Sequence, residues 1–191
     1  ENRTAAEIME SLNDFVKAGK LRYPGVSNWS AQRIAQANDY ARSHGLQPIV
    51  ANQPMWSLAA VDPGQIPDKT LRAMDDEMYM MHMQTGMAAV PYSSQAQGYF
   101  TKLEKQPERA RLMEQYDNDI NRMRFERVKE LASGYGATVN QIALAYLISQ
   151  PFPVVPIVGC RTEEALLDSL GAAELPRFSV DELLYLGLSA E

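Results

Sequence analysis

The sequence predicts an α/β fold in which helices cover a parallel sheet. Three observations point to it: short apolar segments alternate with helical segments four times, these segments are apolar on both faces, and polar residues follow each one directly. Strands that are buried on both faces have this composition. We expect the four strands over residues 23–26, 48–51, 87–91 and 154–158.

Helices on the N-terminal side follow from capping signals and helical spacing. Thr4 opens a capping box ahead of an apolar face, and Gly19 is a natural stop for that helix. Ser30 caps a second helix, which ends at His44-Gly45. A third helix ending near Gly86 is predicted by the spacing of Leu71, Met74, Met78 and Met81.

The C-terminal half is predicted to be largely helical. A long charged region over residues 107–133 has helical spacing, with an expected break near residues 116–118. A second capping box at Thr138 precedes a buried apolar helix. Thr162 and Ser179 are expected to cap the last two helices.

Composition narrows the class of protein. The chain has 191 residues, 46% of them hydrophobic, which allows one sizeable core, and we expect a single domain over residues 1–191. A net charge of -6 and the lack of a basic run argue against nucleic acid as a partner. Cys160 is the only cysteine, which fits a reducing compartment. Because neither a signal peptide nor an apolar stretch of about 18 residues is evident, we expect a cytoplasmic protein without a membrane partner.

Polar side chains follow all four expected strands. The carboxyl ends of parallel strands lie on one face of a sheet, where such folds bind ligands. Amide and hydroxyl groups suit a neutral hydrogen-bonding ligand, and Tyr92 offers a flat face to an aromatic ring. The four polar groups are residues 27–28, 52–53, 92–95 and 159–162.

The segment after the last strand indicates an anion site. Gly159 lets a ligand approach the backbone, and Arg161 adds a fixed positive charge. Thr162 begins a helix whose free N–H groups favour an anion. A phosphate site after the final strands is a recurring feature of β/α barrels.

Each of these residues also has a purely structural interpretation. The alternatives are a cap or turn for Ser27 and Asn28, loop chemistry for Gln53, a core aromatic for Tyr92 and a solvated charge for Arg161. The agreement of four strand ends favours the ligand site. Cys160 has no evident base partner and His82 no paired ligands, so neither a nucleophile nor a metal site is predicted.

Four segments carry a family resemblance. In chain order they are GVSNW, NQPMWSL, VPYSSQAQGYF and QIALAYLISQPFPVVPIVGCRTEEALLDSL. Together they resemble the C-terminal half of an aldo-keto reductase, a (β/α)8 barrel that transfers a hydride between NADP(H) and a carbonyl or alcohol. The resemblance implies a TIM-barrel type of fold in which the four strands resemble the fifth to the eighth.

The resemblance also implies a dinucleotide site. Ser27 and Asn28 match the pair that holds the nicotinamide carboxamide, and Gln53 matches the glutamine that completes this grip. Tyr92 matches the aromatic residue that stacks on the nicotinamide ring. The other implied contacts are Ser93, Gln95 and Gly98 along the pyrophosphate, Gly159, Arg161 and Thr162 around the adenosine 2′-phosphate, and Asp168 and Ser169 near the adenine.

Two positions at the adenine end depart from the family pattern. The family usually has Glu and Asn where this chain has Asp168 and Ser169. The carboxylate is one methylene shorter and the amide is lost. The resemblance implies NADP as the cofactor, and these two departures leave NAD as an alternative.

Half of the barrel has no counterpart in the sequence. An eight-stranded barrel needs about 250 residues, and the family's catalytic Asp, Tyr, Lys and His come from the first half, so no catalytic residue is assigned. One hypothesis is that the chain is the cofactor-binding part of a longer reductase that acts on a carbonyl substrate. The alternative is a non-catalytic dinucleotide-binding or structural half-barrel. Exposed sheet edges would favour self-association or pairing with an N-terminal half.

Overall fold

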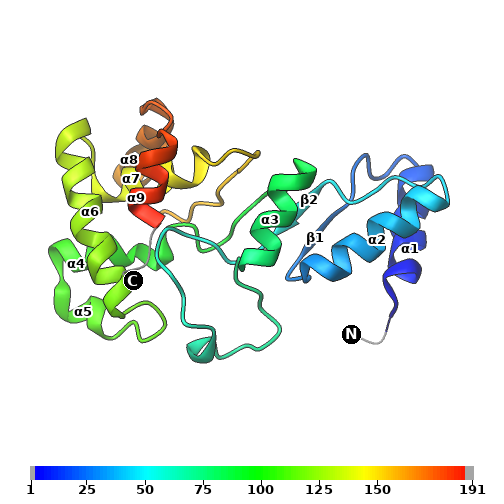
Figure 1. Ribbon diagram of the computed structural model, residues 1–191, viewed down its shortest axis with the longest axis horizontal. Helices are drawn as coiled ribbons and strands as arrows, with labels where there is room; N and C mark the ends of the chain where they lie inside the picture. The colour runs from blue at the N-terminus through cyan, green and yellow to red at the C-terminus, as the bar shows by residue number, and fades with distance from the viewer. Residues whose placement is uncertain (1–2, 188–191) are drawn as a thin grey trace.

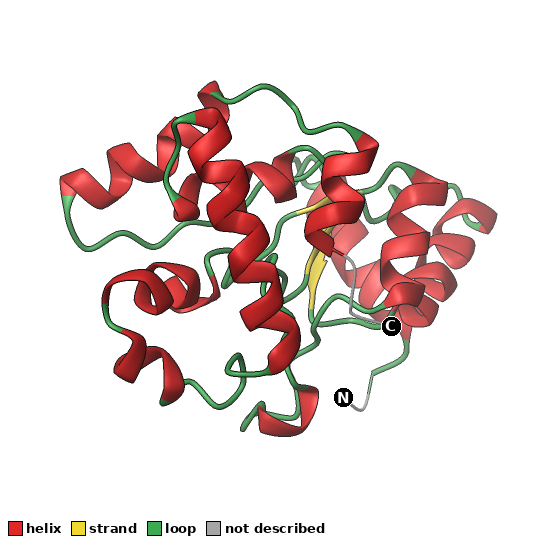
Figure 2. Cartoon of the chain, turned by 60° about the vertical axis from the view of Figure 1, so that its left-hand side comes forward, coloured by secondary structure: helices red, strands yellow, loops and turns green. Residues whose placement is uncertain are grey.

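A three-stranded parallel sheet lies at the centre of the computed structural model, which describes residues 3–187 (Figures 1 and 2). Its strands are β1 (Gly25–Ser27), β2 (Ala51–Gln53) and β3 (Ala88–Ala89), in the order β1-β2-β3. Val26 is in register with Asn52, and Asn52 with Ala89. The α/β class and the parallel sheet are confirmed.

The fourth expected strand is present only as an extended segment. A single bridge joins Ala89 to Val154. The Val155 N–H donates to the Ala89 carbonyl at 2.9 Å, and the Ile157 N–H donates to the Pro91 carbonyl at 2.9 Å. The prediction of a regular strand over residues 154–158 is therefore wrong. Prolines at positions 91 and 153 explain the difference, because neither can donate the backbone hydrogen bond that would extend the ladder beyond this single bridge.

The first two strands also begin later than expected. Regular pairing starts at Gly25 and Ala51 rather than at Tyr23 and Pro48. Pro24 keeps its acceptor role, since the Val50 N–H donates to its carbonyl at 3.0 Å. As prolines cannot donate to the ladder, both strands become regular only beyond them.

Helices surround the sheet, and most of the expected caps are confirmed. Thr4 and Thr138 form capping boxes, while the side chains of Ser30 and Thr162 accept the N–H groups of Arg33 and Ala165. The break predicted near residues 116–118 separates α5 from α6. Within the described residues the helices are α1 (Ala5–Lys17), α2 (Ala31–Ser43), α3 (Asp76–Thr85), α4 (Tyr99–Lys105), α5 (Pro107–Arg111), α6 (Asp119–Tyr135), α7 (Val139–Ile148), α8 (Glu163–Leu170) and α9 (Val180–Gly187). None of them is long and apolar enough to cross a membrane.

Helix α3 begins later than the methionine spacing predicts. Asp75 is its N-cap, and its side chain accepts the Met78 N–H at 2.8 Å. Leu71 and Met74 precede the helix. The Met74 N–H donates to the Met55 carbonyl at 2.9 Å, so this stretch is held in an extended form beside the segment that follows β2. The prediction that Leu71 and Met74 belong to a helix is wrong because this pairing replaces helical hydrogen bonds.

Two apolar clusters form the core. The first packs α1 and α2 against the sheet through Met9, Ile34, Ala37, Ala41, Ile49 and Met87. The second lies between α4, α6, α7 and α9, at the other end of the molecule in Figure 1, and includes Tyr99, Tyr116, Val128, Ile142 and Leu186. The sheet and α3 lie between the two groups of helices.

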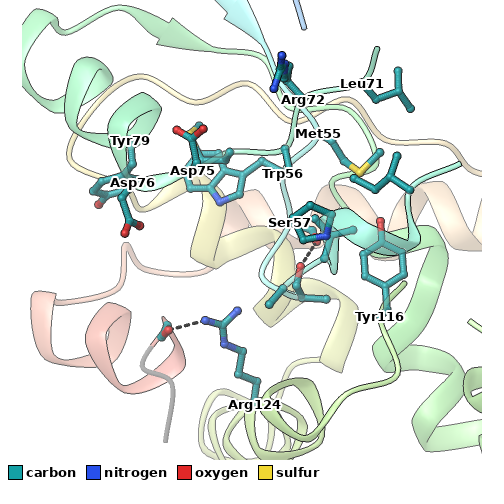
Figure 3. A pocket seen from close by; sticks show the side chains of 18 of the residues that line it. Met55, Trp56, Ser57, Leu71, Arg72, Asp75, Asp76, Tyr79, Tyr116 and Arg124 are labelled. Carbon is teal, nitrogen blue, oxygen red and sulfur yellow. Dashed lines mark hydrogen bonds between the residues drawn. The ribbon is translucent and has the colours of Figure 1, made fainter. Parts of the chain in front are cut away.

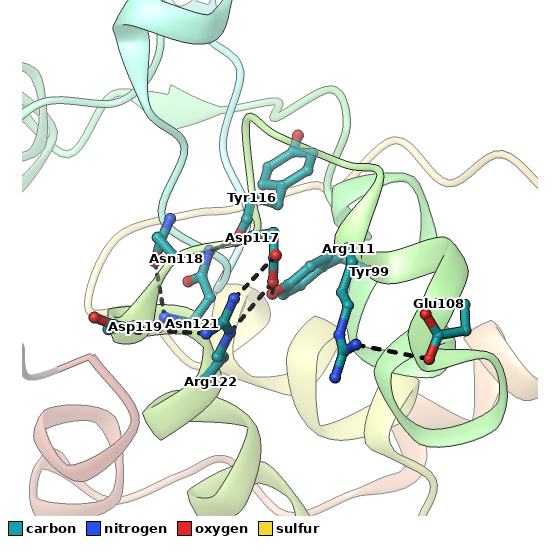
Figure 4. Close-up of polar contacts among 9 residues, drawn as sticks. All are labelled: Tyr99, Glu108, Arg111, Tyr116, Asp117, Asn118, Asp119, Asn121 and Arg122. Carbon is teal, nitrogen blue, oxygen red and sulfur yellow. Dashed lines mark hydrogen bonds and ion pairs between the residues drawn. The ribbon is translucent and has the colours of Figure 1, made fainter.

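The segment from residue 55 to residue 75 is tied to α6 by one buried amide. Asn121 is fully buried, and its Oδ1 accepts the Ala60 N–H at 2.8 Å. Its Nδ2 donates to the carbonyls of Ala60 and Tyr116 at 2.7 and 2.8 Å. Beside it, Asp117 accepts from the Tyr99 hydroxyl at 3.1 Å and pairs with Arg122 at 3.0 Å (Figure 4).

Several apolar side chains along the sheet and at both ends of the helical layer stay exposed. Within the described residues β1 pairs only with β2, so one backbone edge of the sheet is open. On the opposite side of the sheet, Val155 is 60% exposed and Ile157 is 43% exposed. Phe15 on α1 and Leu167 on α8 are 51% and 61% exposed. These side chains leave apolar surface in contact with water.

Buried His82 is expected to make stability depend on pH. It stacks on Phe152 with ring centroids 5.2 Å apart, its Nδ1 donates to the Met87 carbonyl at 2.8 Å, and its Nε2 has no partner within the described residues. Burial lowers the pKa of His82, and the Met87 hydrogen bond opposes that effect. Below about pH 6.5 the unfolded chain therefore takes up the proton more readily, and the free energy of unfolding should fall.

Urea unfolding between about pH 7 and pH 5 checks this expectation, because the pKa of free histidine lies in that window. His82→Gln should flatten the dependence, since glutamine does not titrate and its amide can still donate to the Met87 carbonyl. His44→Gln, at the exposed end of α2, is the matched control and should leave the pH dependence of the free energy of unfolding as it is in the unmodified chain. An unchanged dependence in His82→Gln would contradict the expectation.

Candidate functional site

Four of the predicted site residues meet where β1, β2 and β3 end. The Ser27 hydroxyl donates to the Gln53 carbonyl at 2.9 Å, and the Asn28 N–H donates to the same oxygen at 3.3 Å. The Tyr92 hydroxyl donates to Asn28 Oδ1 at 2.7 Å. Side chains that are 64 residues apart in the chain are thus in direct contact. We call Ser27, Asn28, Gln53 and Tyr92 the strand-end cluster.

The backbone at Asn28 is bent to make these contacts. Its φ of 60° lies in the left-handed region, which a non-glycine residue seldom adopts. The Arg72 N–H also donates to Asn28 Oδ1, at 3.1 Å. With two donors on the oxygen, the amide NH2 group of Asn28 faces away from both. Ser30 rather than Ser27 or Asn28 caps α2, so the capping alternative for the pair is wrong, whereas a turn at Asn28 is present.

Burial and hydrogen bonding act on Tyr92 in opposite directions. Partial burial raises the pKa of its hydroxyl, and the hydrogen bond to Asn28 lowers it. The hydroxyl stays protonated at neutral pH and remains a donor. The ring is therefore held in place by its own polar end, with the rest of the side chain half-buried.

A cavity of about 840 Å³ lies between the loop that follows β3 and the start of α8, and none of the four residues of the strand-end cluster lines it. Its wall includes Ser93, Gln95, Gly98, Gly159, Arg161 and Asp168. Residues 93, 96 and 97 have positive φ values of 48° to 54°, and Gly98 has 77°. Such strained backbone persists only where the surroundings hold it, and it is concentrated at functional sites.

Gln95 connects both sides of this cavity. Its Nε2 donates to Asn140 Oδ1 at 2.9 Å and to the Ser169 hydroxyl at 3.0 Å, while its Oε1 accepts the Gly159 N–H at 3.3 Å. Asp168 accepts from the Thr138 hydroxyl at 2.7 Å and from Asn140 Nδ2 at 2.8 Å. These contacts fix the wall before any ligand binds.

Two predicted residues lie behind the wall rather than in it. Thr162 caps α8, as its structural interpretation predicts, and it does not line the cavity. Ser169 is buried and donates to the Ala165 carbonyl at 2.8 Å. Both can hold the position of α8, which carries Asp168 into the cavity wall.

Lys102 is a lining residue that the sequence analysis missed. Its Nζ donates to the Gln97 carbonyl at 2.9 Å, and its side chain lines the same cavity as Arg161. The spacing holds a signal, because a lysine four residues after Gly98 falls within the short helix α4 that directly follows this glycine. Two cations, Lys102 and Arg161, therefore line the cavity. Among the described residues no group of metal-ligating side chains is present.

Comparison with known proteins gives consistent findings. The family model described as "Aldo/keto reductase family" matches residues 1–186. Norsolorinic acid reductase B of Dothistroma septosporum is 32% identical over 178 residues, which cover 88% of this chain and 41% of that protein. The aryl-alcohol dehydrogenase [NADP(+)] of Phanerodontia chrysosporium is 32% identical over 184 residues, with 90% and 45% covered.

A solved structure has a similar fold. A thermostable aldo-keto reductase in complex with the inhibitor epalrestat superposes with a TM-score of 0.68 at 25% identity. The match covers 97% of this chain and 54% of that one. The chain thus spans about half the length of the relatives it matches.

Proposed function

The chain belongs to the aldo/keto reductase family, and from this premise we propose that it is the cofactor-binding half of an NADP(H)-dependent oxidoreductase. The observation that carries the proposal is the strand-end cluster, in which the hydroxyl of Tyr92 holds the amide of Asn28 beside Gln53. A carboxamide needs both donors and acceptors, and these side chains offer both.

The adjoining cavity fits the rest of a dinucleotide. Its volume of about 840 Å³ lies within the range of cofactor sites. Arg161 and Lys102 supply positive charge for phosphates, and the strained loop over residues 93–98 presents its backbone at the same wall. Bound there, the dinucleotide would supply the hydride for a carbonyl or accept one from an alcohol. The chain's own residues would bind and orient it.

Asp168 bears on the choice between NADP and NAD. Its carboxylate lines the cavity and accepts two hydrogen bonds from neighbouring side chains. A carboxylate beside a 2′-phosphate would repel it, whereas Arg161 would attract it. We favour NADP because Asp168 is already engaged by Thr138 and Asn140, while Arg161 is exposed.

We further propose that strands resembling the fifth to the eighth are present and that an N-terminal half completes the barrel. The open edge of β1 and the exposed Val155, Ile157, Phe15 and Leu167 support this arrangement. The half that would dock there would carry the catalytic residues, in a cytoplasmic enzyme. Self-association through the same surfaces is the competing arrangement, in which the chain binds dinucleotide without turnover.

Two measurements on the 191-residue chain and on the full-length gene product test the proposal. NADPH binding is followed by quenching of tryptophan fluorescence, and turnover by the loss of nicotinamide absorbance with an aromatic aldehyde. We expect binding in both proteins and turnover only in one that includes residues ahead of this chain. Binding without turnover in the full-length product would support the non-catalytic alternative, and no saturable binding in either would overturn the assignment.

A further inference from the structure

A second cavity of about 590 Å³ lies outside the dinucleotide site. It is enclosed by the segment after β2, the start of α3, and helices α6, α7 and α9 (Figure 3). The two cavities share no lining residue. The second cavity is therefore a separate space from the proposed dinucleotide cavity, although its lining residue Arg72 contacts Asn28 of the strand-end cluster through its N–H.

Tyr116 brings a buried donor to this cavity. The residue is 1% exposed, and its hydroxyl makes no hydrogen bond of normal geometry within the described residues, although the Gln115 side chain lies near. In Figure 3 its ring extends toward the segment that carries Met55. Burial raises the pKa of the Tyr116 hydroxyl to about 12, so it keeps its proton. A buried donor without an acceptor is unfavourable, and a ligand oxygen would relieve it.

Arg124 adds a partly buried charge at the same cavity. Its Nη1 donates to the Leu58 carbonyl at 2.7 Å and its Nη2 donates to the Gly187 carbonyl. Its Nε is buried without a partner, and within the described residues no carboxylate pairs with it. Burial lowers the pKa of Arg124, yet a guanidinium keeps its charge at neutral pH. An anion is the natural partner of such a group.

Aromatic side chains make up much of the remaining wall. Trp56 and Tyr79 meet edge to face, with ring centroids 6.2 Å apart, and Tyr146 lies near Arg124. Asp75 and Asp76 also line the cavity, but both are exposed, and water screens their charge. Asp68, Lys69 and Arg72, which are exposed as well, complete the charged part of the lining. Away from these exposed charges the wall combines aromatic rings with one partly buried cation and one buried hydroxyl donor.

We propose that this cavity binds a small aromatic carboxylate that carries a second oxygen on its ring. The carboxylate accepts from Arg124, the ring packs against Trp56, and the ring oxygen accepts from Tyr116. Pockets of this size that combine apolar walls with a few polar groups are typical of ligand sites. p-Coumarate has this chemistry and serves as the probe.

Calorimetric titration of the full-length gene product tests the site with three compounds. p-Coumarate should bind saturably. Cinnamate, which lacks the ring oxygen, and p-coumaramide, which lacks the charge, should each bind about tenfold more weakly, as expected for one lost hydrogen bond or ion pair. Saturating NADPH should leave the affinity for p-coumarate unchanged, because the two cavities are separate.

Two variants assign the contacts. Tyr116→Phe should weaken p-coumarate binding about tenfold and leave cinnamate binding unchanged, and it removes only an unpaired hydroxyl, so the protein should fold. Tyr99→Phe, buried outside the cavity, is its matched control and should leave both affinities unchanged. Arg124→Met should weaken both acids, with exposed Arg109→Met as the control.

Each possible result of these titrations either supports or overturns the proposed binding site. Displacement of p-coumarate by NADPH, equal affinity for acid and amide, or no saturable binding would each overturn the proposal. If Arg124→Met does not fold, the comparison of Tyr116→Phe on p-coumarate and cinnamate still decides it. An equal loss for both acids in Tyr116→Phe would contradict the assigned contact. None of these results bears on NADPH turnover, so the two proposals stand or fall separately.

Discussion

Replacement of Arg161 by alanine is expected to weaken NADPH binding by about 10- to 100-fold and NADH binding by less than about threefold. The proposed site places this guanidinium beside the 2′-phosphate, which only NADPH carries. Charge-assisted hydrogen bonds to phosphate are among the stronger contacts in proteins. Arg161 is exposed, so its removal should not affect folding.

Two further variants, Lys102→Ala and Arg109→Ala, show whether a loss of affinity in Arg161→Ala comes from the 2′-phosphate, from the pyrophosphate or from the change in net charge. Lys102 lines the same cavity, next to the strained loop, and should contribute to binding of the pyrophosphate that both dinucleotides share. Its removal should weaken NADPH and NADH alike. Arg109 on α5 lies outside the cavity and controls for net charge. Fluorescence titration with both dinucleotides gives the four affinities, and an equal loss of NADPH and NADH in Arg161→Ala would contradict a role at the 2′-phosphate.

Replacement of Asn121 by alanine is expected to lower the free energy of unfolding by about 2–4 kcal/mol. The amide is fully buried and makes three hydrogen bonds to the backbone at Ala60 and Tyr116. Alanine would leave one N–H and two carbonyls with fewer partners in a dry environment. The effect should be local first, since these bonds hold the segment from residue 55 to residue 75 against α6.

Urea unfolding measures the loss, and limited proteolysis locates it. Cleavage of Asn121→Ala should rise within residues 59–75 before the rest of the chain opens. Asn118→Ser is the control, because serine can still cap α6 and accept the Asn121 N–H. Its cost should stay below about 1 kcal/mol. A loss of equal size in both variants would show that the cap, and not the buried amide, holds the segment.

Local signals in the sequence predicted helix starts better than strands. The capping boxes at Thr4 and Thr138 depend on residues three positions apart, so they can be read directly. In contrast, the residue at which regular strand pairing begins is determined by the partner strand, which is distant in the sequence. The prolines at 24 and 153 shift pairing in ways that appear only once the partner strand is known.

The sequence likewise predicted one part of the candidate site, the convergence of the strand ends, but not the side-chain contacts around the cavity. The convergence of Asn28, Gln53 and Tyr92 follows from the rule that parallel strands end on one face. The links from Asp168 to Thr138 and Asn140 join elements about 30 residues apart, and no local pattern reports them. Within the described residues the Tyr116 hydroxyl and the Arg124 Nε lack partners because the segment after β2 covers them. No spacing in the sequence predicts the path of that segment.

The sheet order has a consequence for how the chain folds. Its strands occur in space as they occur in sequence, β1-β2-β3, and the segment at residue 154 joins last. Each strand therefore meets a partner that the ribosome has already released. Assembly can proceed from the N-terminal end without waiting for distant sequence, which keeps unpaired edges short-lived during synthesis. Within residues 3–187 the outer edge of β1 stays unpaired, and in the proposed longer enzyme the half that is synthesised before this chain would be the first partner to reach it.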